Sequence, residues 1–294
     1  MSNYFDQKTS FMEPTVTQYG SRMVMTNVVK SKIKRYINFD TRFSDNTETE
    51  FTFQLPERIT NVKQIKIVQI EIPVSFYNIS TVLQNNFFVL TNVTTNTLFQ
   101  IIIPDGNYTQ ETFVVKLQSL LLTNLTFTID SNNICSFTNS STSSSFLLDF
   151  TIYNNGTSCY IGTENLLQSL LGFKSSTYLI NSNSTIKAEK CFNINTIRYL
   201  FLTMEDFANS AYNGFIGMLK TSTVNKKILT RIPFDKTLFP FGTIIQGNLT
   251  NCVRMYHGPV DLQKLKLQLI NEYGIPINLN GGSFSFVLEI EMEE

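Results

Sequence analysis

The sequence predicts a mainly β protein, an antiparallel β-sandwich formed by both ends of the chain, with a small α+β lobe inserted between them. Three observations predict this fold. Residues that favour strands are abundant, with 25 Phe and 12 Tyr among 294 residues, and Asn and Ser supply turns between them. Apolar and polar residues alternate in the two outer parts of the chain. The middle part changes to the apolar spacing of helices.

Composition limits the class of protein. The chain is 42% hydrophobic and 16% charged, which is too apolar and too weakly charged for a disordered protein. Its 23 basic and 23 acidic residues give a formal net charge of zero. A neutral chain has no long-range attraction to nucleic acid or anionic lipid, and little repulsion between its own copies. An AT-rich genome would produce the same excess of Asn, Ile and Phe.

Residues 1–35 are predicted to form an extended N-terminal arm. They show little periodicity and end in a basic cluster of Lys30, Lys32, Lys34 and Arg35. An assembly arm and a frayed terminus are equally compatible with this pattern. The polar start MSNYFDQKTSFMEP has no hydrophobic core of a secretory signal, and no apolar run approaches the ~20 residues that span a bilayer. We therefore expect a protein made inside the cell, without a membrane span.

Residues 36–104 are predicted to be a run of strands. Residues 51–55 alternate with period two and are predicted to stop at Pro56, and the alternation resumes in VKQIKIVQIEIP until Pro73. The segments FFVLTNV and LFQIIIP are typical of two strands joined by a turn at residues 94–96.

Residues 105–186 are predicted to be the inserted α+β lobe. Thr109 is a candidate N-cap for a helix with apolar residues at helical spacing. Strand-like segments LTFTID, NICSFT and FLLDFTIY follow, and a second helix, ENLLQSLLGF, is predicted to end at Gly172. Helices covering one face of a sheet would give this lobe its own core.

Residues 187–294 return to strands and are predicted to share one sandwich with residues 36–104. The segment LQKLKLQLI alternates with period two, as in an antiparallel strand with one buried face. Gly258-Pro259 is predicted to form a turn between a strand ending at Tyr256 and one starting near Leu262. Short strands at regular spacing favour a sandwich or jelly roll over a parallel sheet.

The search for catalytic, cofactor-binding and metal-binding residues predicts none. The chain lacks the patterns GxxxxGK[ST], GxGxxG, HExxH and GxSxG. The single histidine, His257, stands beside the predicted Gly-Pro turn, where a turn residue is expected rather than a catalytic base. The four cysteines lack the spacing of a zinc site and are interpreted as buried, reduced thiols: Cys135, Cys159, Cys191 and Cys252.

The acidic residues also have simpler explanations than chemistry. Glu289 and Glu291 alternate with apolar residues and are predicted to form a solvated strand face with Glu293 and Glu294, rather than a metal site. The pair Glu205-Asp206 is interpreted as a turn after a strand. The basic cluster near residue 32 has no aromatic platform beyond Tyr36, so no nucleic-acid site is predicted.

Several segments, in a consistent order, carry a resemblance to a known family. They are INFDTRF at residues 37–43, FTFQLPERITNVKQIKIVQIEIPVSFYNIS, IPDGNYT, the helix end at residues 171–173, and YHGPVDLQKLKLQLINEYGIPINLNGGSFSFVLEIE. Together they resemble virion structural proteins of nucleocytoplasmic large DNA viruses, the giant viruses.

The resemblance implies a penton or minor capsid protein with a jelly-roll-type sandwich, because the chain is too short for the double jelly roll of a major capsid protein. It implies a place in the virion, with synthesis and assembly in the host cytoplasm. The implied partners are the major capsid protein, neighbouring subunits and further copies of the chain, in a pentamer if it is a penton. No cofactor and no catalytic residue are implied.

A second hypothesis is a carbohydrate- or receptor-binding sandwich, such as a fibre-like attachment protein, with the inserted lobe as its recognition surface. An enzyme is the third. Exposed aromatic residues in a groove would favour sugar binding, whereas a flat apolar flank beside an ordered arm would favour assembly.

Overall fold

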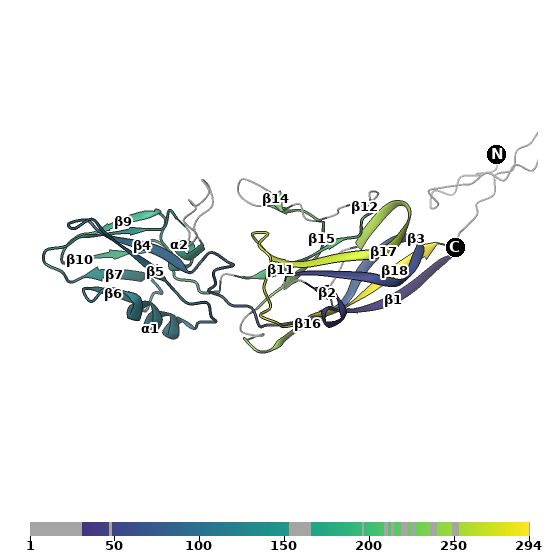
Figure 1. Ribbon diagram of the computed structural model, residues 1–294, viewed down its shortest axis with the longest axis horizontal. Helices are drawn as coiled ribbons and strands as arrows, with labels where there is room; N and C mark the ends of the chain where they lie inside the picture. Colours follow the sequence, from purple (N-terminus) through teal and green to yellow (C-terminus); the bar gives the residue numbers. More distant parts are fainter. Residues whose placement is uncertain are drawn as a thin grey trace, which may run out of the picture.

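The computed structural model describes residues 31–46, 49–152, 166–195, 197–208, 211–212, 215–218, 223–224, 227–235, 240–248 and 253–293. Two lobes follow one another along the long axis of the molecule (Figure 1). The C-terminus lies at the end of the larger lobe that is remote from the smaller lobe. Residues 1–30, predicted to be an arm, lie outside the described residues.

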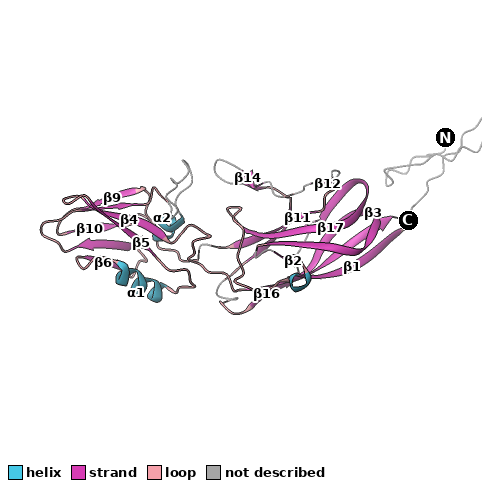
Figure 2. Cartoon of the chain, viewed as in Figure 1, coloured by secondary structure: helices cyan, strands magenta, loops and turns pink. Residues whose placement is uncertain are grey.

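The larger lobe is an antiparallel sheet of nine strands that come from both ends of the chain. Figure 2 shows that strands dominate both lobes. Across the sheet the order is β1 (Lys32–Asp40), β18 (Ser285–Glu293), β3 (Glu50–Pro73), β17 (Val253–Asn271), β11 (Tyr199–Glu205) and β15 (Ile228–Pro233). Short strands β2 (Asp45–Asn46) and β16 (Ile244–Asn248) pair with β3, and β12 (Ala211–Tyr212) pairs with β17. A short 3-10 helix, η1 (Thr41–Phe43), follows β1, and β13 (Gly217–Met218) and β14 (Thr223–Val224) form a separate pair.

One hydrophobic core lies inside this curled sheet. Phe51 of β3 packs edge-on against Phe284, which directly precedes β18, with 5.2 Å between ring centroids. Leu265 and Leu267 of β17, predicted to point inward, are fully buried in the same core. The predicted fold class is confirmed: the protein is mainly β, with a jelly-roll-type antiparallel sandwich and a small α+β insert.

Strand β3 does not stop at Pro56, so this prediction was wrong. Gln54 lies opposite Lys264 and Ile59 opposite Leu262, so residues 55–58 of β3 face a single residue of β17. The extra residues form a bulge. Proline has no N–H for the ladder, and a bulge is where a long strand can accommodate it without ending. The predicted end at Pro73 is confirmed.

The predicted turn at Gly258-Pro259 was also wrong, because β17 continues through it. Met255 lies opposite Gln64 and Val260 opposite Val62, so residues 256–259 face one residue of β3. This second bulge lies on the other strand of the same pair. The two bulges offset one another, which lets the two longest strands remain paired along their length.

The smaller lobe has a core of its own between two sheets. One sheet has the order β5 (Thr97–Ile102), β4 (Phe87–Asn92), β8 (Phe146–Asp149), β9 (Thr177–Ile180), and the other has the order β10 (Ser184–Lys187), β7 (Cys135–Asn139), β6 (Leu125–Ile129). Helices α1 (Gln110–Leu120) and α2 (Leu166–Leu171) contribute to the same core. The rings of Phe127 and Phe137 are in tilted contact within it, with 5.0 Å between their centroids.

The helix ends follow the predicted signals. Thr109 caps α1, and its side chain and that of Thr112 each accept a backbone N–H of the other residue. Gly172 follows α2 with φ of +84°, as predicted for a C′ glycine. A Cβ at this position would lie 2.1 Å from the carbonyl oxygen of Lys190, so only glycine fits.

The insert is longer than predicted. Strands β4 and β5 were assigned to the sandwich, but β4 pairs with β8, and Leu90 lies opposite Leu148. The core of the smaller lobe runs from Ile79 to Phe192 rather than from residue 105 to 186. Sequence periodicity identified the hairpin correctly. It could not show which sheet the hairpin joins, because an alternating strand fits any half-buried sheet.

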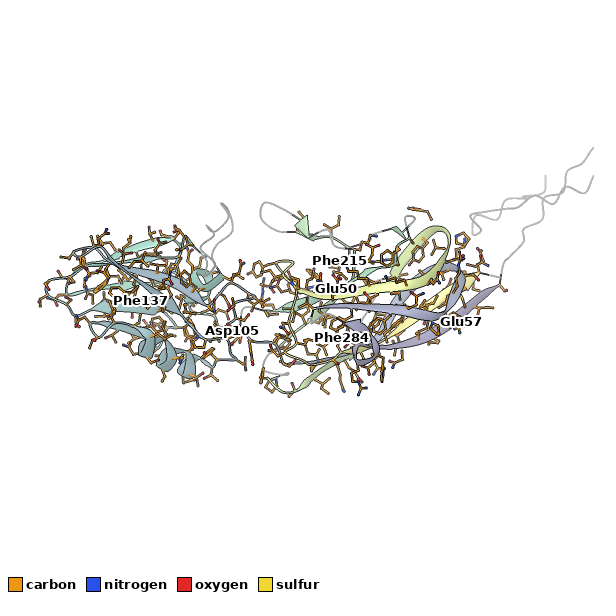
Figure 3. All side chains as sticks on the ribbon, viewed as in Figure 1. Glu50, Glu57, Asp105, Phe137, Phe215 and Phe284 are labelled. Carbon is orange, nitrogen blue, oxygen red and sulfur yellow. The ribbon has the colours of Figure 1, made fainter. Side chains whose placement is uncertain are left out.

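The separate cores lead to a prediction for core substitutions. Phe137 lies in the smaller lobe and Phe284 in the larger one (Figure 3). Replacing a buried Phe by Ala costs about 3–5 kcal/mol. We expect Phe137→Ala to accelerate amide hydrogen exchange in β4, β7 and β8 only, and Phe284→Ala to accelerate it in β3 and β18 only. Equal acceleration in both lobes for either variant would show a single cooperative unit instead.

Candidate functional site

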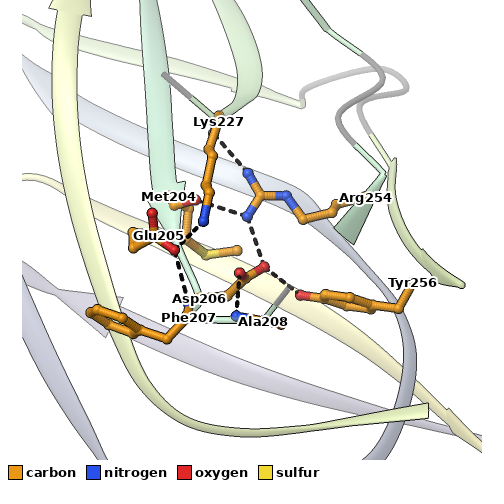
Figure 4. Close-up of polar contacts among 8 residues, drawn as sticks. All are labelled: Met204, Glu205, Asp206, Phe207, Ala208, Lys227, Arg254 and Tyr256. Atoms are coloured by element: carbon orange, nitrogen blue, oxygen red, sulfur yellow. Dashed lines mark hydrogen bonds and ion pairs between the residues drawn. The ribbon is translucent and has the colours of Figure 1, made fainter. Parts of the chain in front are cut away.

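A buried ion pair joins β17 to the end of β11. Arg254 Nη1 lies 2.8 Å from Asp206 Oδ2, and the two side chains are 2% and 0% exposed. Tyr256 donates its hydroxyl to the same carboxylate oxygen at 2.8 Å (Figure 4). Arg254 also donates to the carbonyl oxygens of Met204 and Lys227, at 2.8 and 2.7 Å. The guanidinium therefore ties together three segments of the larger lobe.

These groups satisfy one another, so the cluster is structural. Burial and the adjacent Asp206 carboxylate raise the pKa of Tyr256, which keeps the phenol protonated as a donor. Asp206 accepts a further bond from the backbone N–H of Ala208. Glu205 pairs with Lys227 instead, so the two neighbouring acids have different partners and do not form an acid–base couple. Sequence reasoning missed the buried pair, because Arg254 and Asp206 are distant along the chain.

A second charged cluster lies across β1, β18 and β3. Lys34 Nζ lies 3.0 Å from Glu289, Lys66 lies 3.3 Å from the same carboxylate, and Tyr36 donates to it at 2.9 Å. Lys32 pairs with Glu291 at 2.7 Å. Lys32 and Lys34 of the basic cluster are therefore partners of Glu291 and Glu289 in the acidic C-terminal strand, whereas Arg35 pairs with Glu57.

This arrangement corrects two predictions. Glu289 and Glu291 are 6% and 8% exposed, so they are not a solvated face. The reason is that β1 pairs with β18 and lies beside these two residues. Residues 32–35, which were assigned to the arm, form the start of β1. Burial alone would raise the pKa of Glu289, but hydrogen bonds from Lys34, Tyr36 and Lys66 outweigh it and hold that pKa below its usual range.

His257 is exposed on the bulged part of β17. Cys135 is buried as predicted, whereas the prediction was wrong for Cys191, which is exposed. Both belong to the smaller lobe, so neither is placed beside His257 in the larger one. Burial raises the pKa of the Cys135 thiol to about 12, which makes it a poor nucleophile. Cys159 and Cys252 lie outside the described residues.

The hollows of the described chain are either small or wide open to solvent: the largest, about 410 Å³, lies along α1 and is lined by Tyr108, Glu111 and Lys116 among others. A hollow of about 50 Å³ at the lobe junction, lined by Phe76, Tyr77, Asp105 and Ile277 among others, holds a few waters at most. Within the described ranges, no group of three His, Cys, Asp or Glu side chains is placed to bind a metal ion. The helices that the structure describes are too short and too polar to cross a membrane.

Comparison with known proteins adds little. No protein-family model and no curated protein matches the chain. One similar solved structure is that of the mavirus penton protein, which covers 90% of this chain and 100% of its own, with a TM-score of 0.43 and 8% identity. At this identity and TM-score, the likeness assigns no function to the chain.

The buried ion pair gives a prediction for stability. In Asp206→Ala the Arg254 guanidinium stays buried without its carboxylate, and we expect a loss of about 3–5 kcal/mol in the free energy of unfolding. Glu205→Ala is the matched control, because its pair with Lys227 is about one-third exposed and contributes at most about 1 kcal/mol. Urea unfolding measures both. Equal losses in the two variants would contradict a special role for the buried pair.

The β1–β18 cluster gives a prediction for pH. Because the pKa of Glu289 is lower in the folded than in the unfolded state, its contribution to stability is complete above the unfolded value of about 4.3 and is lost as the pH falls through the folded value. Glu289→Gln removes this titration. We expect the variant to be less stable than the wild type at neutral pH, and the difference to shrink in urea unfolding at progressively lower pH. A difference independent of pH would refute this.

Proposed function

We propose that this chain is a virion structural protein, a penton or minor capsid subunit of a large DNA virus, and that it acts through assembly interfaces rather than as an enzyme. The ordered sequence segments support the family. Most of them form the sandwich, in β1, β3, β17 and β18. The exposed apolar side chains of the smaller lobe support action through interfaces.

The observation that carries the proposal is an apolar row on the outer face of the β5-β4-β8-β9 sheet. The pairing register places Leu98, Thr91, Leu147 and Leu179 side by side across the four strands. Phe146 and Leu148 point into the core, so Leu147 points outward. Leu98 and Leu179 are 56% and 50% exposed. We call Leu98, Leu147 and Leu179 the leucine face.

A row of two exposed leucines and the half-buried Leu147, with Thr91 between Leu98 and Leu147, suits contact with another protein. Ile102 of the same sheet adds a further 44% exposed side chain to this flank. Contiguous exposed apolar surface marks protein–protein contacts more often than it marks a free surface. The charged clusters, in contrast, are committed to holding strands together. Function through surfaces therefore fits this molecule better than chemistry in a pocket.

The alternative hypothesis, sugar or receptor binding by the lobe, lacks the feature that it requires. Aromatic side chains bind sugars when they line an exposed groove. In the described part of the smaller lobe, most aromatic rings lie in its core, including Phe88, Phe113, Phe127 and Phe137, and Tyr108 alone among them lines the open hollow along α1. The most exposed rings of the described chain, such as Tyr36, Phe43 and Phe207, belong to the larger lobe.

The proposal includes the partners and the location that the family resemblance implies. The chain would reside in the virion after synthesis and assembly in the host cytoplasm. It would contact the major capsid protein and neighbouring subunits, and it would form a pentamer in the penton case.

The test uses particles of the virus that encodes the chain, with copies of the chain per particle counted by quantitative mass spectrometry. We expect Leu98→Glu and Leu179→Glu to abolish incorporation, because each places a charge in the contact. Thr126→Glu is the control, since Thr126 is exposed on the other sheet of the same lobe.

All three variants should keep the wild-type thermal transition, as surface substitutions usually change stability by about 0.5 kcal/mol or less. Absence of the wild-type chain from purified particles would refute the proposed function. Incorporation of the two leucine variants at wild-type level would refute the leucine face as the contact.

A further inference from the structure

Strand β1 is an edge of the nine-stranded sheet. It pairs with β18 on one side, and no described strand pairs with its other side. The pairing is unbroken over nine residues, from Lys32 opposite Glu293 to Asp40 opposite Ser285. The strand contains no proline and no bulge. Its first five residues are exposed. It is therefore a long, regular edge of the kind that adds a further strand.

The direction of the backbone groups along β1 follows from its register. The N–H of Thr41 donates to the carbonyl of Phe284, in continuation of the β1–β18 register. In an antiparallel pair, hydrogen-bonded residues alternate with residues whose N–H and C=O point the other way. Odd-numbered residues of β1 therefore bond to β18. Lys32, Lys34, Tyr36 and Asn38 direct their N–H and C=O groups to the open side.

The usual protection of a sheet edge is weak here. Edge strands commonly carry lysines whose charge repels another strand. The lysines of β1 are neutralised by their own neighbour, since Lys32 pairs with Glu291 and Lys34 with Glu289. The opposite edge of the sheet differs, because β15 ends in Pro233 and is bulged against β11. Of the two edges, β1 is the one suited to pairing.

We propose that β1 pairs antiparallel with β1 of a second copy, centred on Tyr36, and joins the two nine-stranded sheets into one. This register overlaps all nine residues of β1. It places residues whose N–H and C=O groups point to the open side opposite the same kind of residue in the other copy. It places Lys32 opposite Asp40 of the other copy, and Lys34 opposite Asn38. Lys32, which pairs with Glu291, and Asp40, which pairs with Arg42, thus meet at both ends of the contact with opposite charges, and no like charges face each other.

The same register covers apolar surface. Ile33, which is 41% exposed, lies opposite Phe39 of the other copy, and Arg35 lies opposite Ile37. The contact is two-fold, so the same strand serves both copies. Contacts around a five-membered ring join two different surfaces instead. The edge pairing is therefore independent of the proposed function, and either one can fail without the other.

The experiment is disulfide trapping in the full chain carrying Cys159→Ser, Cys191→Ser and Cys252→Ser, which removes the exposed thiol and the two thiols outside the described residues. In Tyr36→Cys the two new thiols meet across the two-fold axis, where a hydrogen-bonded pair has Cα atoms about 5.5 Å apart, within disulfide reach. Asn38→Cys is the matched control. It lies opposite Lys34, and its counterpart is displaced by about 13 Å along the strand.

We expect a covalent dimer on non-reducing gels for Tyr36→Cys and little or none for Asn38→Cys. Sedimentation of the background chain, which carries the cysteine-to-serine replacements but no added cysteine, should show a monomer–dimer equilibrium. Asn38→Pro removes an outward N–H while leaving the β18 ladder intact, so it should weaken the dimer at least tenfold relative to Asn38→Ala.

Three results would overturn the edge pairing. They are a monomer at all concentrations, equal cross-linking at positions 36 and 38, and a pentamer that does not cross-link through Tyr36→Cys. The last result would leave the capsid proposal standing. Loss of incorporation through the leucine face, conversely, has no bearing on the dimer.

Discussion

The pairing of β3 with β17 is the constraint on which the rest of the structure depends. These two strands are the longest in the protein, at 24 and 19 residues, and all but β13 and β14 of the larger lobe's strands form one sheet around them. Their pairing joins the N-terminal and C-terminal parts of the chain, so the sandwich cannot form until both are present. The offset bulges let such long strands bend and enclose a core without losing register.

Charge in this protein stabilises strand positions where hydrophobic packing is not sufficient. At one site Arg254 fixes the bulged region of β17 to the ends of β11 and β15. At the other, lysines of β1 and β3 hold Glu289 and Glu291 between them. Both sites place acids where water is largely excluded, and the hydrogen bonds around them compensate for that desolvation. The exposed apolar surface remains available for contacts with other chains.

Sequence periodicity predicted the elements better than their partners. The alternation in residues 51–55 and 264–269 identified strands and their buried faces, and Thr109 and Gly172 marked helix ends, because these signals are local. Pro56 and Gly258-Pro259 misled, because a bulge and a turn use the same residues and only the opposite strand distinguishes them. The burial of Glu289 was missed for a similar reason: a residue on an alternating strand is solvated only if nothing pairs beside it, and β1 comes from the other end of the chain.

The chain enters and leaves the smaller lobe at one place. Phe76 belongs to the core of the sandwich and Ile79 to the core of the insert. A second small hollow is lined by Val74, Phe76 and Asn78 on the way in and by Asn195 and Ile197 on the return path. An insert whose two ends meet can be exchanged, shortened or duplicated during evolution without altering the register of any strand in the sandwich. Related sandwiches can thus diverge in the insert while retaining the same scaffold.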